Sequence, residues 1–177
     1  MQVVVDNYSR MIVGWKLSLN KRMELTYKTL MKSFKMSPTF NGEIISDKGT
    51  ENTGEVPVKL LLGRGIRQLI AKKDIRYSNS MVEAVFRQLK QKFLIKTVET
   101  YQVLYRSLYR FVHQYNNIIP HTMLLGATPT EAYRDEFDRD VFIKEFKANK
   151  DEVFKTRKLS FKKCQKCYKK GWNLLRV

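Results

Sequence analysis

The order of short apolar runs and helix-period segments is the feature that most restricts the fold of this chain. Apolar runs at residues 2–5 and 11–19 flank the turn sequence DNYSR and predict a hairpin. A helical repeat of apolar residues over residues 20–36 follows, and two more short apolar runs stand at Glu43–Ser46 and Ile66–Ile70. This order is typical of an α/β domain built in layers.

Further helices are expected on both sides of the last apolar run. A short helix near Val56–Leu62 precedes it, and longer ones are expected from Ser80 and over about Val98–Tyr115. Thr130 is expected to begin one more helical turn. The predicted class is therefore α/β, with a sheet flanked by helices.

Positive charge dominates the chain and is unevenly spread. The 34 Lys and Arg residues outnumber 17 Asp and Glu, giving a net charge of +17. Residues 61–130 and 153–177 are strongly basic, whereas residues 131–152 are net acidic. We expect a core over residues 1–135 and an acidic-then-basic extension over residues 136–177. Such a basic surface attracts polyanions, nucleic acid above all; the alternative is that the charge only maintains solubility.

Two protein classes do not fit the composition. No apolar run is long enough to span a bilayer, and the first residues lack the pattern of a signal peptide, so we expect a cytoplasmic protein with no membrane partner. The two cysteines, Cys164 and Cys167, make no disulfide framework. Their C-x-x-C spacing supplies half of a zinc site at most, and unpaired thiols are the alternative.

A single carboxylate stands in a basic stretch of the chain. Glu83 lies in the helix expected from Ser80, and Arg87 and Lys90 follow it on one helical stripe. Glu83 has two structural explanations: a capping box with Ser80, or an ion pair with Arg87 four residues later. The functional alternative is a metal ligand, which requires a second carboxylate.

Asp47 supplies a candidate for that second carboxylate. It follows the apolar run Glu43–Ser46 and precedes Gly49, so it either starts a turn or sits where a strand end opens toward a site. Asp47 and Glu83 are separated by thirty-five residues.

Both acids stand in patterns that resemble the catalytic core of retroviral-type integrases and insertion-sequence transposases, whose active site is Asp, Asp, Glu. The segment SDKGT around Asp47 resembles the surroundings of that family's second Asp, and thirty-five residues is the family's common spacing to the Glu. The positions that match the family's pattern around the Glu are Asn79, Glu83, Phe86, Leu89 and Lys90. Three other segments resemble it too: DNYSR with IVGW, YNNIIPH, and GATP with EAY. The resemblance covers about residues 1–135.

The resemblance implies a ribonuclease-H-like fold, with a mixed sheet flanked by helices. It also implies DNA transposition or integration, by metal-dependent phosphodiester cleavage and strand transfer. Asp47 and Glu83 would be the catalytic metal ligands, holding two Mg²⁺ or Mn²⁺ ions about 3.5–4 Å apart. The residues expected to contact DNA are Lys48, Asn79, Arg87 and Lys90. Bacterial insertion-sequence relatives imply a homo-oligomer on DNA, in the cytoplasm and associated with the nucleoid.

One departure from the family's pattern bears on activity. The family's first Asp lies on a strand before the hairpin, and we expect this chain to lack both; Asp6 matches a hairpin Asp that is not catalytic. Strand transfer is therefore expected to be impaired. Ile119 also replaces the family's usual Arg before Pro120. The alternatives are a non-catalytic DNA-binding remnant and a metal-dependent nuclease of the same fold.

Overall fold

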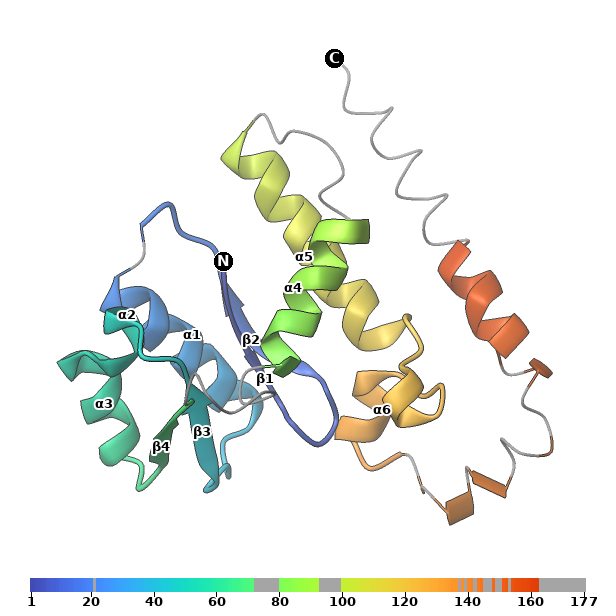
Figure 1. Ribbon diagram of the computed structural model, residues 1–177, viewed down its shortest axis with the longest axis horizontal. Coiled ribbons are helices and arrows are strands. Elements are labelled where there is room, and N and C mark those ends of the chain that lie inside the picture. Colours follow the sequence, from blue (N-terminus) through green and yellow to red (C-terminus); the bar gives the residue numbers. More distant parts are fainter. Residues whose placement is uncertain are drawn as a thin grey trace. The chain divides into compact units, whose positions relative to one another are not determined.

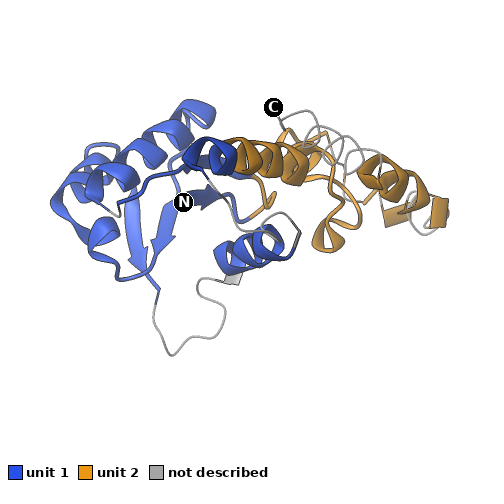
Figure 2. Cartoon of the chain, turned by 90° about the horizontal axis from the view of Figure 1, so that it is seen from above, with its two compact units in different colours: residues 1–7, 12–105 blue, residues 8–11, 106–177 orange. Residues whose placement is uncertain are grey.

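The computed structural model divides the chain into two compact units. The first unit holds residues 1–7 and 12–105, and the second holds residues 8–11 and 106–177 (Figure 2). The predicted boundary at residue 135 stays a prediction. The structure describes residues 1–20, 22–71, 80–92, 100–136, 138, 140–141, 143–144, 148, 151–152 and 154–162, without the side chains of residues 80 and 92.

Two short strand pairs form the β-structure of the first unit. β1 (Gln2–Val5) pairs antiparallel with β2 (Ile12–Lys16), and β3 (Glu43–Ser46) pairs in parallel with β4 (Arg67–Ile70). The predicted hairpin and both later strands are therefore present. The expected mixed sheet is not continuous in the described residues, because each pair makes its ladder hydrogen bonds only within itself.

Helices connect and flank these strand pairs. α1 (Met23–Met36) joins β2 to β3, and α2 (Thr50–Thr53) and α3 (Glu55–Leu62) carry the chain from β3 to β4. A parallel pair requires such a crossover because its strands run in the same direction. The helix expected from Ser80 is α4 (Ser80–Lys92), which packs against β1.

One buried cluster holds the two strand pairs on a common helical layer. Leu30 and Phe34 of α1, Leu61 of α3 and Ile66 before β4 are all nearly inaccessible to solvent. The partly buried side chains packed against this cluster are Val4, Ile44 and Leu60. Because Val4 belongs to β1 and Ile44 to β3, both pairs lie against the layer of α1 and α3 (Figure 1).

The contact between β2 and α1 is close enough to require a glycine. A Cβ on Gly14 would collide with the Ser33 hydroxyl and lie 2.9 Å from the Thr29 carbonyl oxygen. The neighbouring Trp15 is 5% exposed and belongs to the core. Its ring centroid lies 5.3 Å from that of Tyr105, within the same unit.

Most of the long helix α5 (Tyr101–Asn117) belongs to the second unit, where it supplies the buried aromatic residues. Phe111 is fully buried, and its ring centroid lies 5.6 Å from that of Tyr115. Tyr115 also makes an edge-on contact with the His121 ring at 4.7 Å. Burial raises the pKa of Tyr115 to about 12, against a smaller lowering by Arg10.

Two short helical segments come directly after α5. A 3-10 turn, η1 (Thr122–Leu124), precedes α6 (Pro129–Tyr133), which is the helical turn expected near Thr130. α6 begins with a capping box between Thr128 and Glu131. Leu124, Ala127 and Ala132 form a small buried cluster around these segments.

Candidate metal and nucleic-acid site

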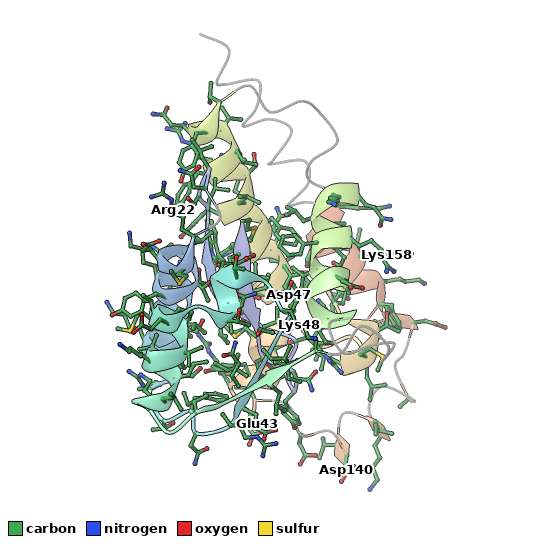
Figure 3. The ribbon with its side chains drawn as sticks, turned by 60° about the vertical axis from the view of Figure 1, so that its left-hand side comes forward. Arg22, Glu43, Asp47, Lys48, Asp140 and Lys158 are labelled. Carbon is green, nitrogen blue, oxygen red and sulfur yellow. The ribbon has the colours of Figure 1, made fainter. Side chains whose placement is uncertain are left out.

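Asp47 lies directly after β3, at the carboxyl end of the parallel strand pair. In α/β sheets this end commonly carries functional side chains, because the loops that follow the strands open there. Asp47 and Lys48 are both exposed, and they lie at the far end of β3 from Glu43 (Figure 3). Glu43 forms an ion pair with Arg67 of β4, with N and O 3.3 Å apart. One end of the strand pair therefore carries an ion pair, whereas the other carries the exposed side chains of Asp47 and Lys48.

The two carboxylate oxygens of Asp47 have different surroundings. Oδ1 accepts hydrogen bonds from the Gly49 backbone N–H at 3.0 Å and from Asn52 Nδ2 at 2.7 Å. Oδ2 accepts none from the residues that the structure describes. An exposed carboxylate with one oxygen held and the other available suits a hard divalent cation such as Mg²⁺ or Mn²⁺. The residue thus fits the predicted metal role.

Asn52, which the sequence did not single out, links Asp47 to distant parts of the first unit. Its Oδ1 accepts a hydrogen bond from Gln2 Nε2 at 2.8 Å and lies 3.2 Å from the Thr26 hydroxyl. Its backbone carbonyl accepts from Gln68 Nε2 at 3.0 Å. The only local signal was an amide five residues after Asp47; its partners lie far away in the sequence.

The second predicted ligand, Glu83, lies in the first turn of α4 and is exposed. Its pairing with Arg87 is not formed among the described side chains, and the capping box with Ser80 involves a side chain outside them. Arg87 and Lys90 are exposed on the same helix. No described contact joins Glu83 to Asp47, but neither is buried against apolar neighbours.

Several other predicted groups remain without a structural test. Asn79, Cys164 and Cys167 lie outside the described residues.

Within the described part of the chain, no three His, Cys, Asp or Glu side chains gather as a metal site, so Asp6 completes no three-ligand set there. None of the described helices is both long and apolar enough to cross a bilayer. Ile119, which stands where the integrase and transposase pattern usually has Arg, is buried.

Comparison with known proteins relates the fold to one class. No family model matches the chain, and no curated protein matches it in sequence. Among solved structures it is similar to the catalytic core domain of BIV integrase, with 18% sequence identity and a TM-score of 0.56. The similarity covers 76% of this chain and 84% of that one. The chain therefore has an α/β fold like that of an integrase catalytic core, with helices flanking small sheets.

Proposed function

We propose that this chain is the catalytic core of a DNA transposase or integrase, with a ribonuclease-H-like fold. The observation that carries the proposal is Asp47, whose carboxylate stands at a strand end with one oxygen anchored and one available. The fold similarity to the BIV integrase core and the sequence pattern around Asp47 and Glu83 support it.

In this proposal Asp47 and Glu83 hold Mg²⁺ or Mn²⁺. When bound, two such ions activate the attacking oxygen and stabilise the leaving oxygen of a phosphodiester. Asp47 contributes an oxygen from the end of β3 and Glu83 one from α4. The DNA phosphates are held by the cationic side chains nearby: Lys48, Arg87 and Lys90, with the amide of Asn79.

The proposal extends to partners and location. DNA would be bound mainly through its phosphates, as the net charge of +17 favours, and the protein would work as a homo-oligomer on DNA in the bacterial cytoplasm.

Metal titration tests the site itself. Free Mn²⁺ is followed by electron paramagnetic resonance during addition of wild-type protein, Asp47→Asn or Glu83→Gln. We expect each substitution to weaken binding at least tenfold, because each removes a charged ligand of a site that has few. Glu43→Gln is the matched control: an exposed carboxylate on β3, at the opposite end of the strand from Asp47. Binding that is absent, or equal in wild type and both site variants, would exclude the metal site.

Incubation with supercoiled plasmid and Mn²⁺ separates the alternatives. Nicking with weak joining of DNA ends, both lost in Asp47→Asn, is the expected result. Nicking without joining would favour a metal-dependent nuclease of the same fold. DNA binding with neither reaction would favour the non-catalytic remnant.

A further inference from the structure

We propose that Asn52 is a positioning residue that orients the Asp47 carboxylate for a divalent cation, and that Gln2 and Thr26 fix Asn52 in turn. The inference rests on the proposed metal role of Asp47. It adds a set of residues that contact neither metal nor DNA in the proposal. These residues come from β1, α1 and α2.

The amide of Asn52 can satisfy its neighbours in only one orientation. Its oxygen faces Gln2 Nε2 at 2.8 Å, and its nitrogen faces Asp47 Oδ1 at 2.7 Å. Turning the amide over would set a carbonyl oxygen against a carboxylate oxygen and an NH₂ group against the NH₂ of Gln2. Because a carboxylate only accepts, the NH₂ end of Asn52 faces Asp47, and its oxygen is left to accept the bond from Gln2 that holds the amide in place.

Thr26 secures the other side of this arrangement. Thr26 lies in α1 and is 5% exposed, and its hydroxyl accepts a hydrogen bond from Gln2 Nε2 at 2.8 Å. The same hydroxyl lies 3.1 Å from Gln2 Oε1 and 3.2 Å from Asn52 Oδ1, so its one proton can serve either oxygen. A buried β-branched side chain has little rotational freedom, and it therefore holds the two amides in place.

The two hydrogen bonds to Asp47 Oδ1 fix the orientation of the carboxylate, and this orientation determines the position of Oδ2. The Gly49 N–H is part of the loop itself, whereas the Asn52 amide is anchored in other elements of the unit. Without Asn52 the carboxylate keeps one donor and is free to rotate about its side-chain bonds. Removal of an outer partner of this kind typically weakens metal binding about 10–100-fold, because the ligand loses its orientation.

The same Mn²⁺ titration, applied to the full chain, tests the inference. We expect Asn52→Ala to raise the Mn²⁺ dissociation constant about tenfold, at the low end of that range, and Gln2→Ala to raise it by less. Asn117→Ala is the matched control, since Asn117 Nδ2 donates to the His113 carbonyl on α5 at 2.9 Å, in the second unit. Urea unfolding of each variant keeps a loss of fold distinct from a loss of orientation.

An NMR measurement adds a second test, whose result a change in stability alone would not alter. The Asn52 side-chain NH₂ resonance should shift when Mg²⁺ is added to wild type and stay fixed in Asp47→Asn. If wild type binds Mn²⁺ and Asp47→Asn weakens it, but folded Asn52→Ala binds as wild type does, the positioning role is wrong while the proposed function stands. If wild type binds no Mn²⁺, both are wrong.

Discussion

Glu131 joins a helix cap to an ion pair. Its Oε2 accepts from the Thr128 backbone N–H at 2.7 Å and from the Thr128 hydroxyl at 2.9 Å. The Arg157 guanidinium donates to both carboxylate oxygens, at 2.8 and 3.1 Å. Burial raises the pKa of Glu131, but the bonds from Arg157 and Thr128 together outweigh it, so the pKa is lowered overall.

We predict that this carboxylate makes stability fall in acid. Its pKa in the folded protein lies below the ordinary value of 4.5, so the unfolded chain binds protons first as pH decreases. The stabilisation is present above that ordinary value and is lost as pH falls through the folded pKa. Since the pair is partly exposed, the loss is well under about 1 kcal/mol.

Thermal unfolding at pH 7 and at acid pH measures this effect. The acid-induced decrease in melting temperature should be smaller in Glu131→Gln than in wild type, because the variant has no carboxylate to protonate. Glu136→Gln, whose partner Arg134 lies 3.7 Å away on the surface, is the control and should behave as wild type does. Equal decreases in wild type and Glu131→Gln would contradict the assignment.

Single residues also show how far the sequence carries a prediction. The apolar run at residues 11–19 predicted a strand of the hairpin, and its Trp15 is buried, as an aromatic residue in such a run commonly is. The importance of Asn52 was not predicted, because it depends on Gln2 and Thr26, which only the tertiary fold brings near. Asp47 was predicted from its local pattern; its role and that of Glu83 stay predictions.

The helices and strands predicted from the sequence patterns are present, but several of their observed ends differ from the predicted ones. The helix expected from Asn20 begins at Met23, and its N-cap, Arg22, makes no side-chain capping bond. Met23 and Tyr27 belong to the apolar repeat over residues 20–36 but remain more than a third exposed, because the buried contact of α1 is centred on Leu30 and Phe34. A helical period therefore predicts the helix and not the width of the face that is covered.

The buried face of α3 gives a prediction at this scale. Leu61 is 2% exposed and belongs to the cluster that holds both strand pairs, whereas its neighbour Leu62 is 71% exposed. Leu61→Ala should lower the free energy of unfolding by about 2–5 kcal/mol, through lost burial and the cavity left behind. Leu62→Ala should change it by less than about 0.5 kcal/mol. Urea titration of both variants checks this; similar losses would mean that the assigned buried face is wrong.

For the whole molecule, net charge makes a prediction about DNA. Binding that is mainly electrostatic weakens linearly on a log–log plot against salt, with a slope set by the number of phosphates contacted. Arg87→Ala should make that slope shallower by about one unit. The control is Lys59→Ala, which removes the same charge from an exposed lysine paired with Glu55 on α3.

Fluorescence anisotropy of a labelled duplex at several KCl concentrations gives the slopes. If Arg87 contacts a phosphate, the slope of Arg87→Ala differs from that of wild type, whereas the slope of Lys59→Ala does not. Equal slopes for all three proteins would show instead that Arg87 belongs to a solvated helix face.

The two strand pairs of the first unit also differ in how early each can form while the protein is being synthesised. β1 and β2 need only the turn between them, so they can pair soon after they leave the ribosome. β3 must wait until two helices and β4 have emerged. Until then Ile44 and Ile45 have no ladder partner in β4, so this stretch stays open to aggregation for longer than the hairpin does.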